Sequence, residues 1–480
     1  MIKISKFNNV YIRVEFSDNR IMENFYKHFS DYVEGYQHDL RYTHDNWDGQ
    51  IHFYDQLTGL IYKGLIKDII GYFRTKNLDF EIEQEYFLEL SKKPDDYKDF
   101  VENLQINGKQ LWEHQKSAVF DALRRGGALI QCPTSSGKTL IIYVVLQALL
   151  QTHQKALVVV PKRALREQTK DDWIDYGMDP SMIGTSKDKK YDRRIIIMTM
   201  DSTRNLPKEF FKQFDIVIVD EAHRSDTKTI TNILENCVNC YYRLGFSGSF
   251  FKTKANLKIL RGLMGDIYNV ITTKELMDLN VVSKLKVKIM MVNHSDRSKK
   301  FCRQLNYDDE ISFLETCEYR TDFIARFLAS RKQNTLFLIK HIEHGKLIAE
   351  KVKEISDKQV FFLDGTDSVE KRKEVINIVE NNDDCLICST FGIFGEGVSV
   401  LNLQNIVFGI PMKSPTQVIQ AIGRGLRKCL DESKNNVNCY DIIDDLRYKS
   451  KINYGYRHGL ERVNLYTDSK FDLELKEFEL

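Results

Sequence analysis

The stretch GALIQCPTSSGKTL (127–140) decides the fold of the first large domain of this 480-residue chain. A short apolar run, GALIQ (127–131), leads into a turn rich in small polar residues, and an apolar helix is predicted over 139–150. Backbone N–H groups of such a turn, together with the helix N-terminus, bind anionic phosphate. The stretch therefore predicts a strand, a phosphate-binding loop and a helix, as an α/β domain requires.

Lys138 and Thr139 give this loop its expected chemistry. The Lys138 ammonium is predicted to reach the β- and γ-phosphates of a nucleotide, and the Thr139 hydroxyl to hold Mg²⁺. Cys132 stands where the strict pattern has glycine, and a chance Gly-Lys-Thr is the alternative that the strand–helix context disfavours. The loop residues expected to line the phosphate cradle are Pro133, Thr134, Ser135, Ser136 and Gly137.

A second stretch, FDIVIVDEAH (214–223), is an apolar strand that ends in adjacent carboxylates. We expect Asp220 to bind Mg²⁺ largely through water and Glu221 to orient or deprotonate an attacking water. Alone, such a pair is usually a solvated turn. Because it follows the phosphate loop at the expected separation, it predicts nucleotide hydrolysis.

Apolar strands alternate with helical patterns from residue 105 onward, which predicts two α/β domains with parallel sheets. The first 100 residues are aromatic-rich with short alternating runs, and they predict a small α+β module. The polar stretch 89–100 is the expected linker. We place the module at 1–100, the first α/β domain at 101–283 and the second at 284–480. The segment 295–320 has no strong period and is expected to decorate the second sheet. The predicted strands are 127–131, 155–160, 194–199, 214–220 and 242–247, then 334–340, 359–364, 384–390, 405–410 and 437–443.

Composition excludes several classes of protein. An apolar fraction of 42% with 29% charged residues supports large cores and excludes disorder, and 7 Pro with 25 Gly exclude a collagen-like chain. The net charge of +2, from 70 basic and 68 acidic residues, carries no global signature of nucleic-acid binding. The longest apolar runs are too short for the roughly 20 residues of a membrane helix. No apolar signal segment opens the chain and its 9 Cys are scattered, so we expect a cytoplasmic protein that contacts no membrane.

Three motifs together resemble those of superfamily 2 helicases and translocases: the Gly-Lys-Thr loop, DEAH (220–223) and QAIGRGLR (420–427). The resemblance covers about residues 105 to 445, and other segments follow the family order. These are LWEHQ (111–115), VVVPKRALREQ (158–168), IMTMDST (197–203), GFSGS (245–249), TLFLIKHIEHG (335–345) and STFGIFGEGVSV (389–400).

The resemblance implies two tandem RecA-like domains that use ATP and Mg²⁺. Gln115 would read the adenine, and Gly397 would contact the nucleotide. Two positions depart from the family: Ser249 stands where Thr is common, and Ser399 stands where many members place Asp. The residues expected to act in catalysis are Lys138, Asp220, Glu221, His223, Gln420, Arg424 and Arg427.

Arg424 and Arg427 are spaced three apart, which would place them on one helical face. In the family such arginines reach the γ-phosphate, where a finger arginine contributes about 10³–10⁵ in rate. A surface pair beside Lys428 is the alternative.

Nucleic-acid contacts are inferred from family position, because short polar and basic side chains at strand ends grip phosphates without reading sequence. For any one of these residues a solvated loop is nearly as good an explanation. They are Lys162, Arg163, Thr199, Lys340, His341 and Thr390.

The spacings Cys237-x-x-Cys240 and Cys385-x-x-Cys388 raise the alternative of a four-thiolate zinc site. The two pairs belong to different predicted sheets, so we interpret them as small buried apolar residues instead.

Aromatic and cationic side chains interleave in EGYQHDLRYTHDNWDGQIHFYDQLTG (34–59). Such side chains are suited to stack on bases. The interpretation that we favour instead is that Trp47 and half of the tyrosines build the core of the module. With NWDG (46–49), IGRGLRK (422–428) and HGLERVNLY (458–466), the chain also resembles the recombination and branch-migration helicases of large phages. That resemblance implies branched DNA as substrate (forks, Holliday-type junctions and R-loops), 3′ to 5′ polarity and an N-terminal module (1–100) that binds DNA. It also implies a monomer that meets a single-strand-binding protein, and the host cytoplasm as compartment.

Three alternatives remain. A DEAD-type RNA helicase would carry Asp in place of His223, and Gln420 and Leu426 also argue against it. A restriction motor would carry a nuclease or specificity extension, which the 35 residues after 445 are too few to form. A non-motor annealing protein with a nucleotide switch would be favoured if Glu221 or Arg427 were missing, and both are present.

Overall fold

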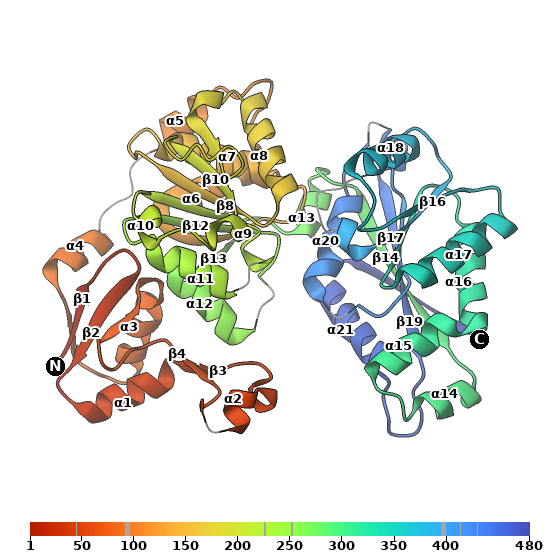
Figure 1. Ribbon diagram of the computed structural model, residues 1–480, viewed down its shortest axis with the longest axis horizontal. Helices are drawn as coiled ribbons and strands as arrows, with labels where there is room; N and C mark the ends of the chain where they lie inside the picture. The colour runs from red at the N-terminus through yellow and green to blue at the C-terminus, as the bar shows by residue number, and fades with distance from the viewer. Residues whose placement is uncertain are drawn as a thin grey trace. The chain divides into compact units, whose positions relative to one another are not determined.

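The computed structural model describes residues 1–44, 46–91, 97–224, 227–250, 253–394, 400–412, 414–429 and 431–480. The chain forms two compact units: residues 1–132 with 136–270, and residues 271–480 with 133–135. Within the described part, no helix is long and apolar enough to cross a bilayer. Figure 1 shows the elements of both units in chain order.

The first unit begins with a small α+β module, as predicted. Its main sheet has the order β5-β2-β1-β6, in which β2 pairs antiparallel with β1 and β5 while β1 and β6 run parallel. A separate hairpin, β3–β4, extends from it. The strands are β1 (Ile2–Lys6), β2 (Tyr11–Phe16), β3 (Ser30–Tyr32), β4 (Gln50–His52), β5 (Leu60–Tyr62) and β6 (Phe80–Ile82). The helices are α1 (Asn19–His28), α2 (Leu40–Thr43), α3 (Ile66–Thr75) and α4 (Gln84–Ser91), with short 3₁₀ turns at Tyr36–His38 and Lys63–Leu65. The expected linker is described only in part, because 92–96 lie outside the described residues.

The rest of the first unit is a parallel sheet, for which the described residues give the strand order β13-β7-β12-β11-β8-β10-β9. The strands are β7 (Gly127–Gln131), β8 (Ala156–Val160), β9 (Ile183–Thr185), β10 (Ile195–Thr199), β11 (Ile216–Asp220), β12 (Tyr242–Ser247) and β13 (Ile267–Asn269). The helices are α5 (Lys98–Asn103), α6 (Glu113–Arg125), α7 (Lys138–Leu149), α8 (Arg163–Asp175), α9 (Met200–Thr203), α10 (Lys208–Phe211), α11 (Thr227–Asn236) and α12 (Lys254–Met264).

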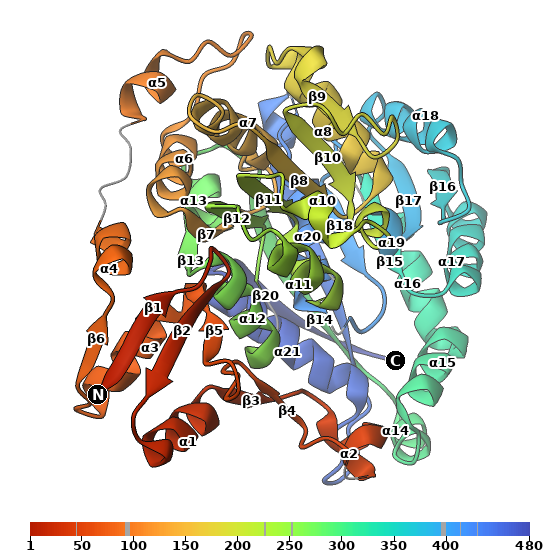
Figure 2. The same ribbon diagram turned by 60° about the vertical axis from the view of Figure 1, so that its left-hand side comes forward.

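Two cores flank this sheet. Along β7, Ala128 and Ile130 face a core built with α6, α7 and α8, whereas Leu129 faces a core built with α11 and α12. The second core also contains the buried side chains of the N-terminal module. Figure 2 shows α12 between the first sheet and this module. Strands covered on both faces are apolar at successive positions, which is why they were predicted from short continuous runs.

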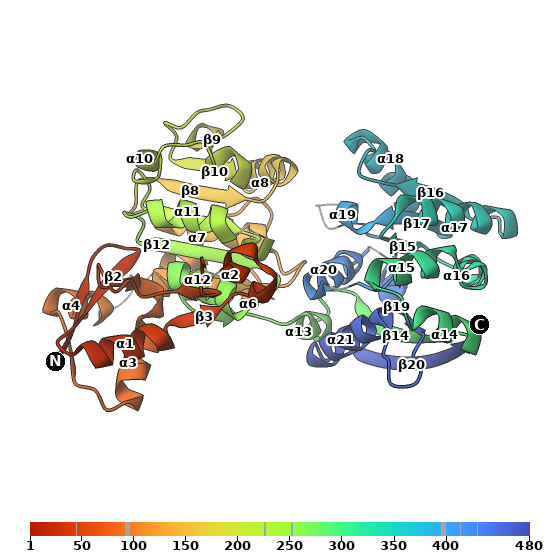
Figure 3. The same cartoon turned by 60° about the horizontal axis from the view of Figure 1, so that its bottom comes forward.

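The second unit contains another parallel sheet, whose described strands follow the order β16-β17-β15-β18-β19-β14-β20. Helices α16 and α17 pack on one face, and α13, α18, α20 and α21 on the other (Figure 3). The strands are β14 (Lys284–Asn293), β15 (Thr335–Ile339), β16 (Gln359–Leu363), β17 (Cys385–Thr390), β18 (Asn405–Phe408), β19 (Asn436–Asp445) and β20 (Asp472–Glu479). The helices are α13 (Thr273–Asp278), α14 (Asp296–Cys302), α15 (Tyr307–Thr316), α16 (Glu318–Ser330), α17 (Ile342–Ile355), α18 (Val369–Glu380), α19 (Phe391–Phe394), α20 (Pro415–Gly425) and α21 (Tyr454–Asp468).

The predicted fold class, two tandem RecA-like domains behind a small α+β module, is confirmed. The segment 295–320, which showed no strong period, forms α14, α15 and the start of α16. The division at residues 100 and 283 stays a prediction.

Candidate nucleotide site and nucleic-acid contacts

The carboxyl ends of the parallel strands in the first sheet bring the predicted site residues to one edge. The loop 132–137 follows β7, Asp220 ends β11, and Ser247 ends β12, which lies between them in the sheet. Ligands of open parallel sheets bind outside this edge.

The loop turns into α7 through Gly137, which has a left-handed backbone with φ 82°. Glycine suits this position because L side chains rarely adopt such a φ. Space is also short, since a Cβ at Gly137 would lie 2.1 Å from Gln115 Nε2. Gln115 donates from Nε2 to the Ser136 carbonyl at 3.0 Å, and its Oε1 accepts the Trp112 N–H at 3.0 Å. Gln115 is therefore buried against the loop.

Lys138 is the first residue of α7, and its ammonium lies between two carboxylates. Lys138 Nζ donates to Glu221 Oε1 and lies 3.3 Å from Asp220 Oδ1. Burial lowers the pKa of Lys138, but the two carboxylates outweigh burial and hold that pKa above its usual value. Burial raises the pKa of Asp220. A lysine shared by two acids can exchange these partners for phosphate oxygens.

Glu221 follows β11 with a left-handed backbone, φ 52°. Its N–H donates to Asp220 Oδ1 at 2.8 Å. A residue other than glycine rarely adopts such a φ, and strain of this kind gathers at functional sites.

His223 joins the DEAH motif to the GFSGS motif. Its Nδ1 lies 2.6 Å from Ser247 Oγ and 3.2 Å from Glu221 Oε2. The Ser247 hydroxyl donates to the Ser249 carbonyl at 2.5 Å, and Oγ accepts the Ser249 N–H at 3.2 Å. The two motifs are thus linked through direct hydrogen bonds.

Three predicted nucleic-acid contacts lie at the same edge. Lys162 and Arg163 are exposed at the start of α8, just after β8. Thr199 ends β10, which pairs with β8, but it is buried and caps α9 by accepting the Ser202 N–H at 3.3 Å. Its hydroxyl is therefore engaged in a helix cap, a role that the sequence reasoning missed.

The other three predicted contacts lie together in the second unit. Thr390 ends β17, opposite Ile339 of the neighbouring β15, and Lys340 and His341 follow Ile339 directly. His341 Nδ1 lies 2.7 Å from Glu315 Oε2.

Helix α20 carries Gln420, which is buried, and Arg424, which is half-buried. The helix ends at Gly425, so Arg427 follows it and is exposed. The expectation that both arginines share one helical face is therefore wrong. Glycine costs about 1 kcal/mol in a helix interior, so Gly423 and Gly425 favour a short helix here. Gly397 and Ser399 lie outside the described residues.

The cysteines of the weighed zinc site are buried apolar residues. Cys237 and Cys240 lie in the core between α11 and the first sheet, and Cys385 and Cys388 lie within β17 of the other unit. All nine thiols are free.

Sequence reasoning also missed Trp112 as a functional candidate. Its ring is 48% exposed beside Gln115, in the segment preceding α6, and lies 5.5 Å from the His114 ring. The tryptophan of LWEHQ, three residues before Gln115, was the available signal.

In the aromatic segment 34–59 of the N-terminal module, some side chains pack in the module's core and others lie outside it. Tyr54 is buried in the module's core and donates to the Val14 carbonyl at 3.0 Å. Trp47 is only partly buried and lies under Arg41, 4.8 Å from the guanidinium to the ring centre. Tyr36 and Tyr42 meet edge to face at 4.8 Å near the β3–β4 hairpin. The favoured interpretation is correct for Tyr54 and wrong for Trp47, which lies outside the hydrophobic core.

Comparison with known proteins identifies the class first. Residues 105–252 match the family described as "Type III restriction enzyme, res subunit", and residues 319–429 match "Helicase conserved C-terminal domain". This pair of RecA-like domains defines a superfamily 2 helicase, as the motifs predicted.

The chain is 32% identical to "ATP-dependent DNA helicase uvsW" of Enterobacteria phage T4, over 98% of this chain and 97% of the relative. It superposes on the crystal structure of T4 UvsW with a TM-score of 0.53 and 28% identity, over 100% and 99% of the two chains. A DNA-bound Type ISP restriction-modification enzyme, LlaBIII, shares only the fold, with a TM-score of 0.56 and 15% identity over 84% of this chain and 34% of the enzyme. The chain belongs to the UvsW family of helicases.

Proposed function

We propose that the protein is an ATP-dependent DNA helicase or translocase that acts on branched DNA, namely forks, Holliday-type junctions and R-loops, in phage-type recombination, repair and replication. The observation that carries the proposal is the cluster in which one buried lysine, Lys138, serves Asp220 and Glu221 at the carboxyl edge of the first sheet. Membership of the UvsW family supports DNA rather than RNA as the track.

ATP is the substrate that suits this cluster. The phosphates would lie over the loop 133–137, with Lys138 exchanging its carboxylate partners for the β- and γ-phosphate oxygens. Thr139 and Asp220 offer a hydroxyl and a carboxylate, the hard oxygen ligands that Mg²⁺ takes, so the residues present fit the ion. Mg²⁺, when bound, neutralises charge on the phosphate oxygens.

Glu221 and the arginines supply the remaining catalytic groups in this proposal. Glu221 accepts a proton from, or orients, the attacking water. Arg424 and Arg427 stabilise the charge on the γ-phosphate in the transition state, with Gln420 and His223 positioning neighbouring groups. We also propose that Gly397 contacts the nucleotide, on the sequence resemblance alone.

The adenine would be read beside α6. Gln115 recognises its edge, and the exposed Trp112 ring offers a face on which the base stacks.

Basic and polar residues at the strand ends of each sheet are proposed to contact the DNA backbone. These contacts read phosphate and not base sequence. The residues are Lys162, Arg163, Thr199, Lys340, His341 and Thr390.

The wider setting of the protein is proposed on the sequence resemblance alone. We propose a monomer that works in the cytoplasm of a bacterial host and meets single-strand-binding protein on the same DNA. The proposed domains are residues 1–100, 101–283 and 284–480.

Lys138→Ala tests the proposal. DNA-stimulated ATP hydrolysis should fall to background, because the variant lacks the ammonium that would contact the β- and γ-phosphates, while DNA affinity stays within about threefold. Lys208→Ala is the matched control, since Lys208 is an exposed lysine on the short helix α10. DNA-stimulated ATP hydrolysis that persists in Lys138→Ala would refute the proposal of an ATP-dependent helicase.

The proposed preference for branched DNA is tested by comparing nucleic-acid substrates of matched length. ATP hydrolysis should be stimulated more by forks, four-way junctions and RNA–DNA hybrids than by single strands or plain duplex at one stated salt concentration. Equal stimulation by all of them would refute the preference for branched DNA.

A further inference from the structure

The N-terminal module packs tightly against the first RecA-like domain. A Cβ added to Gly64 would lie 2.2 Å from the Arg261 carbonyl, and a Cβ added to Gly262 would lie 2.7 Å from the Tyr62 ring. These glycines therefore allow the module's backbone to reach α12 directly. The module and the two helices α11 and α12 also share one hydrophobic core, so their contact is a fixed part of the first unit.

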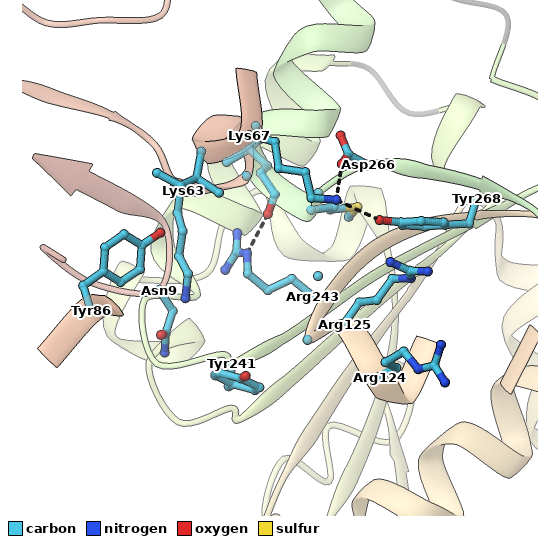
Figure 4. A pocket seen from close by; sticks show the side chains of 18 residues that line it. Asn9, Lys63, Lys67, Tyr86, Arg124, Arg125, Tyr241, Arg243, Asp266 and Tyr268 are labelled. Atoms are coloured by element: carbon cyan, nitrogen blue, oxygen red, sulfur yellow. Dashed lines mark hydrogen bonds and ion pairs between the residues drawn. The ribbon is translucent and has the colours of Figure 1, made fainter. Parts of the chain in front are cut away.

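Ion pairs frame the contact along the whole of α12. Asp31 is 9% exposed and meets two lysines of this helix, so its pKa stays below the usual value: burial raises it, but the lysines outweigh burial. We call this contact between the module and α12 the seam, and Figure 4 shows its end near Lys67 and Asp266. Residues at that end line a cavity of about 290 Å³. The pairs are Asp31 with Lys254 (2.8 Å) and Lys258 (2.9 Å), Asp68 with Arg261 (3.0 Å), and Lys67 with Asp266 (2.9 Å).

Glu235, in the last turn of α11, receives two tyrosines of the module. Tyr11 and Tyr62 are opposite each other on β2 and β5, and their rings stack at 5.3 Å. Both hydroxyls donate to Glu235 Oε1, each at 2.7 Å. Burial first and the Glu235 carboxylate second raise the pKa of both phenols, so they remain donors.

Arg243 connects this end of α11 to the sheet. It lies near the start of β12, is 4% exposed, and donates to the carbonyls of Leu234 (2.7 Å), Cys237 (2.9 Å) and Leu263 (2.6 Å). One guanidinium therefore holds the C-terminal ends of α11 and α12. Burial lowers the pKa of Arg243, and the Glu235 charge is among the groups that oppose this.

The other end of β12 is Ser247, the residue bonded to His223 of the DEAH motif. The module's tyrosines contact Glu235, and Arg243 bonds the carbonyl of the adjacent Leu234. From Arg243 the strand β12 leads to Ser247, which contacts His223. Packed cores respond to small displacements as units, which allows such a path to carry a change in position.

We propose that docking of the N-terminal module on Glu235 positions the DEAH and GFSGS motifs for ATP hydrolysis, with Glu235 and Arg243 as positioning residues. The inference rests on the proposed function and extends it: the module acts on turnover as well as on any DNA that it contacts. Loss of the tyrosine hydroxyls changes the hydrolysis step while the nucleotide loop itself is untouched.

The double variant Tyr11→Phe with Tyr62→Phe tests the inference in the full-length protein. It removes both hydroxyls and keeps both rings in the seam. We expect DNA-stimulated kcat to fall about fivefold or more, with KM for ATP and DNA affinity within about twofold of the wild type. Tyr54→Phe is the matched control, because Tyr54 donates its buried hydroxyl within the module and away from the seam.

Neither the double variant nor the Tyr54→Phe control changes Arg243. The variant Glu235→Gln gives a second measurement. Glutamine retains an acceptor oxygen for the tyrosines but removes the negative charge that acts on Arg243, so kcat should fall again with KM unchanged. Double and control variants with the same kcat would overturn the inference, as would a loss of kcat that only follows a matching loss of thermal stability. A wild-type protein without DNA-stimulated hydrolysis would instead refute the proposed function, so the two failures are distinguishable.

Discussion

The two parallel sheets use buried carboxylates in opposite ways. In the first, one lysine ammonium serves both Asp220 and Glu221 at the end of β11. In the second, two fully buried acids of β19 each have their own arginine: Arg462 donates to both oxygens of Asp441 at 2.8 and 2.7 Å, and Arg320 to both oxygens of Asp444 at 2.8 and 2.9 Å.

Further donors complete the second arrangement. Tyr466 donates its hydroxyl to Asp441 at 2.9 Å, and His294 Nε2 lies 2.9 Å from Asp444. Paired arginines hold these acids in a fixed geometry, whereas a shared lysine can exchange partners. The difference teaches that a buried charge cluster indicates a ligand site where its pairing is exchangeable, and a structural role where the pairing is complete.

Glu221→Gln should have the largest effect and should affect activity alone. ATP turnover is expected to fall by about 10²–10⁴, because the amide cannot accept a proton from water. ATP binding, measured by equilibrium titration, should remain. Turnover near the wild-type value would remove Glu221 from the catalytic groups.

Arg320→Ala should instead damage stability. The variant leaves the Asp444 charge buried and without its bidentate partner, which costs about 3–5 kcal/mol in the free energy of unfolding. Denaturant titration measures this loss, and Arg326→Ala on the exposed side of the same helix α16 is the control. A loss below about 1 kcal/mol would mean that water replaces the guanidinium and that the comparison fails.

His294 predicts a pH dependence for the second unit. Burial lowers its pKa, but Asp444 outweighs burial and raises the pKa to about 9. A raised histidine pKa stabilises the fold fully below the unfolded value of about 6.5, and this contribution, up to about 3 kcal/mol, is lost as pH rises through 9. His294→Gln should flatten the fall in the free energy of unfolding between these pH values. An unchanged slope would assign the effect to another group.

Thr199→Ala is expected to have the smallest effect. Removing the cap of α9 should lower the free energy of unfolding of the first unit by about 1 kcal/mol. Thr199→Ser keeps the hydroxyl and should retain the wild-type free energy of unfolding. DNA affinity, measured for both variants, shows whether the same hydroxyl also contacts phosphate: a loss confined to the alanine variant supports that contact.

Much of this molecule could be predicted from local pattern. The strands β7, β8, β10, β11 and β12 were predicted because continuous apolar runs signal a sheet covered on both faces. The strands β9 and β13 were missed since three residues carry no period, and β20 because its sequence DLELKEFE alternates charge at an exposed sheet edge. β14 was also missed, although KLKVKIMMVN starts with the alternation of a half-buried strand.

The candidate site shows the same division. Gly137, Lys138, Asp220 and Glu221 could be predicted because loop and strand ends are local signals. The cap made by Thr199 and the end of α20 before Arg427 depend on where each helix begins and ends, which is the least certain part of a pattern.

The sequence by itself determined the class of protein, since the phosphate loop, the DEAH carboxylates and the motif around Arg424 are short stretches with a fixed order. Only the tertiary structure decided which distant residues meet. Glu235 is 224 residues from Tyr11 and 173 from Tyr62, and a pairing at such separation has no local signal. Packing of the module on α11 and α12 brings them together, because burying a shared apolar face stabilises a contact that no short motif encodes.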